Sequence, residues 1–186
     1  MHRRPLLALL EAHRARHPED DARVRTIEDF VRAHADCFDR SCRPGHVTGS
    51  AWIVSADLTQ VLLTHHRKLG RWLQLGGHAD GDPDLLAVAL RETREESGLV
   101  RLSTLPGDDH GLLDVDSHGI PARGADPAHV HHDVRFLLVA GPGQPLRRSE
   151  ESIDLRWVRW EKLPSLAEDG SLLRMAARAR ARLGLA

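Results

Sequence analysis

The chain has 186 residues, of which 41% are hydrophobic and 28% charged, and its formal net charge is -1. This length suits one domain with a small extension, and the composition is that of a globular protein rather than a disordered one. The charge excludes a general attraction to nucleic acid or to a membrane surface. Two cysteines make no disulfide framework, and the apolar run near the N-terminus breaks at Glu11. We therefore expect a cytoplasmic protein without a signal peptide or a membrane span.

The predicted elements begin with two helices, at residues 5–16 and at about 20–39, the second marked by Val24, Ile27 and Val31 at helical spacing. A break at residues 42–46 follows. The rest of the chain reads as strands and two further helices. The expected strands are residues 47–55, 60–66, 71–77, 111–117, 131–140 and 153–160, and the expected helices are 82–98 and 171–183.

These strands do not alternate regularly with helices, so a doubly wound parallel sheet is not expected. We predict an α+β fold in which a mixed β-sheet is sandwiched between helices. Residues 1–44 would form an N-terminal helical extension packed on a main domain of residues 45–186.

The helix at residues 82–98 carries an unusual acidic end, with the sequence RETREESGL at residues 91–99. Glu92, Glu95 and Glu96 stand at i, i+3 and i+4 and share one face, where like charges cost roughly 0.2–0.5 kcal/mol per pair. Asp82 is the expected N-cap and Pro83 the first helical residue. The sheet-facing side would carry four residues, namely Leu86, Ala89, Leu90 and Thr93.

Two interpretations of the acidic face remain open. Arg91 can reach Glu95 at i+4, and the face can be an ordinary solvated surface with salt bridges. Alternatively, the carboxylates and the backbone of the Gly76–Gly77 pair just upstream supply oxygen ligands to a hard cation such as Mg²⁺ or Mn²⁺. An isolated Glu-Glu-x-Gly would favour the first interpretation.

The longer segment GGHADGDPDLLAVALRETREESGL resembles the Nudix box, G-x5-E-x7-R-E-U-x-E-E-x-G-U, where U is an apolar residue. Aligned on Gly77, the matching positions are Arg91, Glu92, Glu95, Glu96, Gly98 and Leu99. Two positions depart from the pattern, since Thr93 replaces the first U and Pro83 the first glutamate. In the family that glutamate is similar to a brace for the box arginine, a role that Asp80, Asp82 or Asp84 could take over.

The resemblance implies the Nudix fold and hydrolysis of a nucleoside diphosphate linked to another moiety. It implies Mg²⁺ or Mn²⁺ as cofactor, held by the Gly77 carbonyl, Glu92, Glu95 and Glu96, with Arg91 also in the catalytic site. The attacking water needs a general base. Family members use either the first helix glutamate, here Glu92, or one from a later loop, and the segment RRSEESIDLRW offers Glu150 and Glu151 there.

Other polar groups are weaker candidates. In HVHHDVRF, alternation places four residues on one strand face, which lines a substrate pocket or faces water: His129, His131, Asp133 and Arg135. Trp72 can contact substrate by stacking. A final set, His34, Cys37, Cys42 and His46, lacks the spacing of a zinc finger.

Two rival functions fit the same resemblance. One is a Nudix-fold module that senses a nucleotide without turning it over, and the other is an enzyme similar to isopentenyl-diphosphate isomerase, which would need a catalytic cysteine. Cys37 and Cys42 come too early for that role. We expect a nucleotide-derived small molecule as partner, no nucleic acid and no membrane, and we leave open a homodimer. The sequence does not indicate which nucleoside diphosphate derivative is the substrate.

Overall fold

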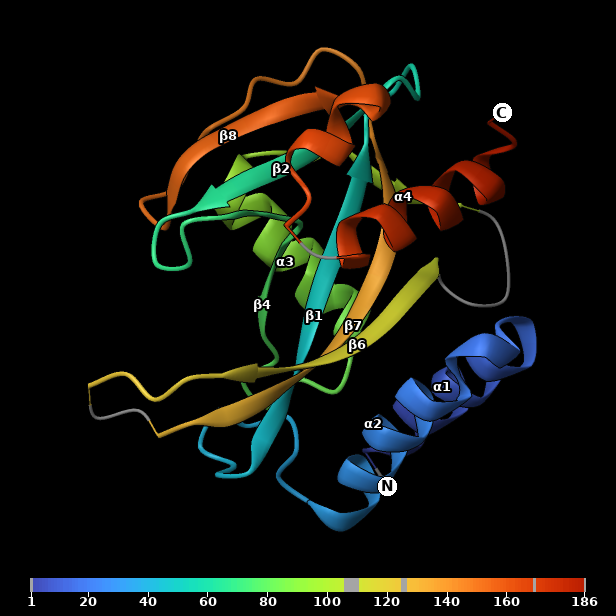
Figure 1. Cartoon of the computed structure of the whole chain (residues 1–186), viewed down its shortest axis with the longest axis vertical. Helices are drawn as coiled ribbons and strands as arrows, with labels where there is room; N and C mark the ends of the chain where they lie inside the picture. The colour runs from blue at the N-terminus through green and yellow to red at the C-terminus, as the bar shows by residue number, and fades with distance from the viewer. Residues whose placement is uncertain (1, 106–110, 125–126, 169, 186) are drawn as a thin grey trace.

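The computed structural model describes residues 2–105, 111–124, 127–168 and 170–185. The helices are α1 (Arg4–Arg16), α2 (Asp21–Ala33), α3 (Leu85–Ser97) and α4 (Gly170–Leu183), with 3-10 turns at Pro18–Asp20 and Trp160–Ser165 (Figure 1). The strands are β1 (Gly45–Val54), β2 (Gln60–His66), β3 (Trp72–Leu73), β4 (Leu75–His78), β5 (Leu102–Thr104), β6 (Leu112–Ile120), β7 (His129–Ala140) and β8 (Ser152–Arg159).

The sheet is organised around β1, which pairs in parallel with β7 along its whole length. The other edge of β1 is shared, because β4 pairs antiparallel with Thr48–Ala51 and β2 pairs antiparallel with Ile53 and Val54. Beyond these strands, β7 pairs with β5 and β6, and β2 pairs with β3 and β8. The sheet is mixed, as predicted. Its first arm, on one side of β1, contains β7, β5 and β6, and its second arm, on the other side of β1, contains β4, β2, β3 and β8.

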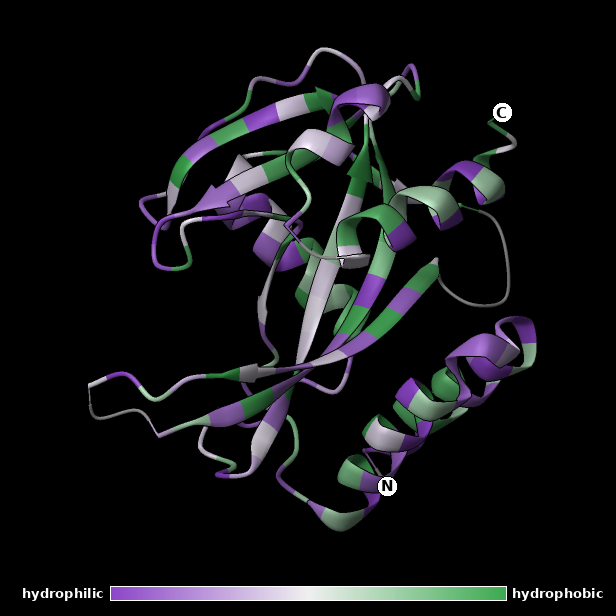
Figure 2. Ribbon diagram, in the orientation of Figure 1, coloured by the Kyte–Doolittle hydropathy of each residue, from purple (hydrophilic) through white to green (hydrophobic). Residues whose placement is uncertain are grey.

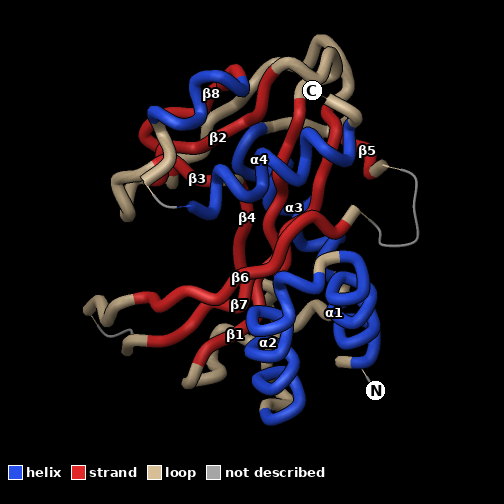
Figure 3. The backbone as a smooth tube through the Cα atoms, turned by 45° about the vertical axis from the view of Figure 1, so that its right-hand side comes forward, coloured by secondary structure: helices blue, strands red, loops and turns tan. Residues whose placement is uncertain are grey.

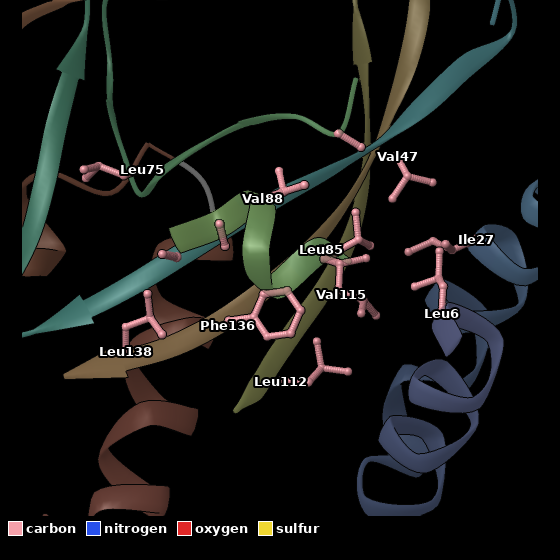
Figure 4. Packing of buried hydrophobic residues seen from close by; sticks show 14 of the residues in the cluster. Leu6, Ile27, Val47, Leu75, Leu85, Val88, Leu112, Val115, Phe136 and Leu138 are labelled. Atoms are coloured by element: carbon pink, nitrogen blue, oxygen red, sulfur yellow. The ribbon is translucent and has the colours of Figure 1, made fainter. Parts of the chain in front are cut away.

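Helices cover both faces of the sheet, which confirms the predicted α+β sandwich (Figures 1 and 3). On one face, α1, α2 and α3 pack over a core that includes Leu6, Ile27, Val88 and Phe136 (Figure 4). On the other face, α4 packs over Trp52 and its neighbours. Every residue of β1 is buried because both of its faces are covered. The N-terminal helices therefore contribute directly to the core on which α3 rests.

Several element bounds differ from the predicted ones. The second helix ends at Ala33 rather than near residue 39, because His34 takes an extended backbone conformation. β5 was not predicted, and its three residues are too few for a periodic pattern. The hairpin of β6 and β7 is longer than predicted at its tip, with β6 reaching Ile120 and β7 starting at His129.

The start of α3 also corrects the sequence prediction. The N-cap is Asp84, whose carboxylate accepts a hydrogen bond from the backbone N–H of Ala87, and the helix begins at Leu85. Asp82 instead accepts from the backbone N–H of Asp84, so Pro83 lies in the loop and not in the first turn. At the other end, Gly98 takes the left-handed conformation (φ 73°) that a helix C-terminus favours.

Candidate active site

The candidate site lies at the C-terminal half of α3, where the helix changes from hydrophobic to hydrophilic residues (Figure 2). Glu92 and Glu96 are half-buried, whereas Glu95 is exposed. The expected sheet-facing side is also present: Ala89 and Thr93 are buried, and Leu86 and Leu90 pack against the core, joined by Leu85 and Val88. The Thr93 hydroxyl is satisfied within the helix by the Ala89 carbonyl at 2.7 Å, so its position in place of an apolar residue leaves no polar group unpaired.

Gly77, in β4, lies directly against the Glu92 carboxylate. A Cβ atom at this position would overlap both carboxylate oxygens and the carboxyl carbon of Glu92. The close approach of backbone and carboxylate therefore requires glycine here. It places the Glu92 carboxylate directly against the backbone of β4.

The electrostatics of the site favour a cation. Burial raises the pKa of Glu96 to about 8; a hydrogen bond from the Gly76 backbone opposes this, and the nearby charges of Glu92, Glu151 and Glu95 add to it. Burial also raises the pKa of Glu92, against the opposing effect of Arg91. The carboxylates thus carry more negative charge than their surroundings stabilise, and an added cation would relieve it.

Arg91 is held by a backbone carbonyl and by its neighbour. Its guanidinium donates to the His78 carbonyl at 2.8 Å and to Glu92 at 2.9 Å, rather than bridging to Glu95. Asp84 caps α3, and Asp80 forms a two-pronged ion pair with Arg40 at 2.6 Å in each bond. Pro83 stands where the family has a glutamate that braces the box arginine. Here the His78 carbonyl holds Arg91 instead, and the charge of Asp80 acts on Arg91 from nearby.

The loop that precedes β8 docks onto the end of α3. The backbone N–H groups of Arg147 and Ser149 donate to the carbonyls of Ser97 (2.7 Å) and Glu96 (3.3 Å). From the other side, Arg67 binds the Glu150 and Glu151 carbonyls, each at 2.8 Å. Both glutamate side chains are exposed, and the charge of Glu151 reaches Glu96. The loop predicted to supply a general base thus lies beside the helix glutamates.

A family model described as NUDIX domain matches residues 45–178. The chain belongs to the Nudix family. The match begins at the first residue of β1 and leaves α1 and α2 outside it. No curated protein matches the chain, and none of the described helices has the length and apolar character to cross a bilayer.

Solved Nudix structures share the fold at low sequence identity. An Ap4A hydrolase of C. elegans, in a binary complex, has a TM-score of 0.60 at 17% identity, covering 74% of this chain and 97% of that one. A Nudix hydrolase of Clostridium perfringens has a TM-score of 0.56 at 23% identity with the same coverage. The Nudix domain of Shewanella oneidensis NrtR, complexed with ADP ribose, has a TM-score of 0.50 at 22% identity and covers 74% of this chain and 87% of that one.

In this Nudix domain the polar face of β7 is a buried network. Asp133 and Arg135 are only 2% and 3% exposed, so the alternative in which they face water is wrong. Arg135 donates to Asp133 at 2.7 Å and to Asp114 at 2.9 Å, and Arg174 of α4 also binds Asp114 at 2.9 Å. Asp133 also accepts bonds from Thr48, Ser50 and Gln74. These contacts join β1, β6, β7 and α4.

Trp72 lies on β3, half-buried, at the edge of the second arm. Its ring stacks on His65 with a centroid separation of 5.1 Å, and the Arg156 guanidinium lies 4.3 Å from its centroid. The Trp72 ring, which the sequence suggested for stacking on a substrate, is therefore already in contact with two side chains. By contrast, Trp52 is fully buried and Trp157 packs against the core.

The structure brings together a different set of histidines from the one that the sequence analysis considered and set aside. His46 separates from Cys37 and Cys42 and lies in a cluster with His129 and His131, because β1 and β7 pair in parallel. The nearby rings of His78 and His118 surround this cluster. The alternation in HVHHDVRF places His129 and His131 of this cluster on one face, but no local pattern could identify β1 as the partner strand that supplies His46.

Proposed function

We propose that this protein hydrolyses a diphosphate bond in a nucleoside diphosphate linked to another moiety, with Mg²⁺ or Mn²⁺ as cofactor. The observation that carries the proposal is the geometry of α3, where Glu92, Glu95 and Glu96 stand at i, i+3 and i+4 and the Glu92 carboxylate lies directly against Gly77 of β4. Burial and the neighbouring carboxylates raise the pKa of Glu96, so its charged form needs a partner of opposite charge. Membership of the Nudix family and the presence of all three helix glutamates of the box support the same conclusion.

The donor atoms of the site fit a hard divalent cation. The Gly77 carbonyl, Glu92, Glu95 and Glu96 are the residues that would hold the ions, and they offer oxygen only. The glycine at position 77 leaves the space that close approach requires. When bound, such cations neutralise the charge of the diphosphate oxygens and make a water molecule more acidic.

The residues around the ligands position them. Arg91 fixes the Glu92 carboxylate through its 2.9 Å bond while the His78 carbonyl holds Arg91 in place. The general base is Glu151 in this proposal, because its exposed carboxylate lies in the docked loop close enough to act on Glu96. Glu92 is the alternative base, although its bond to Arg91 restrains it.

Substrate recognition would use the surface between β3 and the docked loop. Trp72 is stacked on His65 and lies under Arg156, so a nucleotide base would stack on it in place of one of these two side chains. Glu150 in the same loop and His131 on β7 remain candidate substrate contacts. Asp133 and Arg135 would act indirectly by holding β1, β6 and β7 in place.

The test is a panel of nucleoside diphosphate derivatives with Mg²⁺, with a phosphatase added to release countable phosphate from the products. Running the active reaction in ¹⁸O-labelled water would identify the phosphorus that is attacked. Glu151→Gln is expected to lower kcat by about 100-fold while leaving KM nearly unchanged, as loss of a general base does. The matched control is Glu161→Gln, an exposed glutamate after β8.

Each rival function predicts a different outcome of this panel. Tight ligand binding without turnover of any compound would favour the sensor module. Isomerisation of an isopentenyl diphosphate would favour the isomerase, but burial raises the pKa of both Cys37 and Cys42 to about 11, so neither thiol is activated. Equal loss of activity in Glu161→Gln would contradict the role given to Glu151.

A further inference from the structure

His46 is a buried histidine without a hydrogen-bond partner. It is 3% exposed, and neither of its ring nitrogens has a partner among the described residues. Buried polar groups are nearly always paired, so an imidazole with both nitrogens unpaired needs an explanation. Its neighbours are three other rings, those of His78, His129 and His131, with centroids 4.7 to 5.0 Å away.

His129 and His131 face His46 from the adjacent strand. His131 is the register partner of His46 across the parallel β1–β7 pair, and His129 lies two residues earlier on the same face. The Nε2 atoms of His129 and His131 are 3.2 Å apart. Two imidazole nitrogens on one tetrahedral Zn²⁺ are about 3.3 Å apart, as follows from Zn–N bonds of about 2.0–2.1 Å. One nitrogen from each of the three rings lies within 4.8 Å of the others.

The second nitrogen of His129 is oriented as in a metal ligand. Its Nδ1 lies 2.9 Å from the Pro127 carbonyl, to which it can donate. A bond of this kind fixes the tautomer, leaves the lone pair on Nε2, and is the usual outer contact of a metal-binding histidine.

The charge state of the cluster also suits a metal. Burial and the neighbouring histidines lower the pKa of His46 to about 4 and that of His131 to about 3. Neutral imidazole is the form that binds metal.

We propose that His46, His129 and His131 form a second metal site, separate from the box glutamates and selective for a transition metal such as Zn²⁺. Three imidazole nitrogens suit Zn²⁺ far better than Mg²⁺, which prefers oxygen. The ion would hold the first residues of β7, on the tip side of the long β6–β7 hairpin (Figure 1), against the first residues of β1. It would also lie beside His78, the residue that follows Gly77 and whose carbonyl holds Arg91.

The experiment is a Zn²⁺ titration of the metal-stripped full chain in excess Mg²⁺, which occupies the carboxylate site. We expect one tight equivalent of Zn²⁺ in the wild type and in Glu96→Gln. Replacing one ligand, in His46→Asn or in the half-buried His129→Gln, is expected to weaken Zn²⁺ binding by at least about 100-fold, since even outer-contact changes cost 10–100-fold. Crystals of the wild type with Zn²⁺ should show anomalous density among the three rings.

Two matched variants control for other sites. His17→Gln, at the end of α1, should bind Zn²⁺ as the wild type does. Cys42→Ser tests the other group of close donors, His34, Asp36 and Cys42, and should also leave the binding unchanged. Wild-type binding no tighter than that of His129→Gln, or loss of binding in Cys42→Ser instead, would overturn the proposal. Anomalous density at the glutamates and not at the histidines would overturn it as well.

Discussion

Two groups of three carboxylates lie on different faces of this Nudix domain, and they differ in how their charge is balanced. Asp114, Asp116 and Asp133 face a set of arginines, namely Arg135, Arg174 and Arg178. Of the glutamates Glu92, Glu95 and Glu96, Glu92 accepts a hydrogen bond from the Arg91 guanidinium.

The pKa values follow this difference. Burial raises the pKa of Asp116 and Asp133, but the charge of Arg135 and the hydrogen bonds to each carboxylate together outweigh it, so the net pKa of each is lowered. Burial raises the pKa of Glu92 and Glu96, and there the rise persists. Carboxylates balanced by arginines act as structural ties, whereas the unbalanced set is suited to hold a cation.

Removing divalent cations should give the largest effect. We expect hydrolysis to disappear in excess EDTA and to return with Mg²⁺ or Mn²⁺, because the glutamates then lack the charge that neutralises the substrate. The fold should persist, since the two hydrophobic clusters and the aspartate network do not depend on that cation. Phosphate release and circular dichroism on the same sample measure both. Undiminished turnover in EDTA would show that the glutamates do not need a cation, and the contrast with the arginine-balanced aspartates would then have no functional meaning.

Glu96→Gln separates catalysis from stability at the glutamates. Turnover is expected to fall by at least about 100-fold, because a charged ligand is lost while the shape is retained. Without metal, the variant should melt at the same temperature or slightly higher, since one of three crowded like charges is gone. Glu11→Gln, on the exposed side of α1, is the control. Near-normal turnover would identify the three glutamates as ordinary surface charge.

Arg135→Met tests the aspartates that are balanced by arginines, and there the expected effect is on stability. It leaves Asp133 buried with no guanidinium of its own strand, so the free energy of unfolding should fall by about 3–5 kcal/mol, as for other broken buried pairs. Arg25→Met removes the exposed ion pair with Asp21 on α2 and should change stability little. Urea unfolding of the two variants provides the measurement. A similar effect in both would mean that the buried network is not a structural tie.

Pro83→Glu restores the box glutamate and should have the smallest effect. The free energy of unfolding should fall by about 0.4–1 kcal/mol, because the unfolded chain gains freedom when proline is lost. Activity should be kept or modestly raised, since Arg91 is already held by the His78 carbonyl. Thermal melting and kcat measure the two quantities. A large fall in kcat with an unchanged fold would show that the loop requires proline.

The local order of the chain was predictable to a useful degree. Strands and helices with a clear apolar period were located to within a few residues, because side-chain direction along one element depends on spacing alone. The start of α3 was misplaced by two residues, since Asp82 and Asp84 are both good capping residues and packing selects between them. β5 is too short to leave any pattern.

The sequence by itself determined which side chains share a face of α3 and that a glycine precedes them at the box spacing, because both depend on distances of a few residues. Tertiary structure decided which charges meet. The pairing of β1 with β7 joins His46 to His131, and the docking of the 147–149 segment brings Glu151 toward Glu96. Such contacts join residues far apart in the chain, and they depend on the order and direction of strands, which local periodicity does not encode.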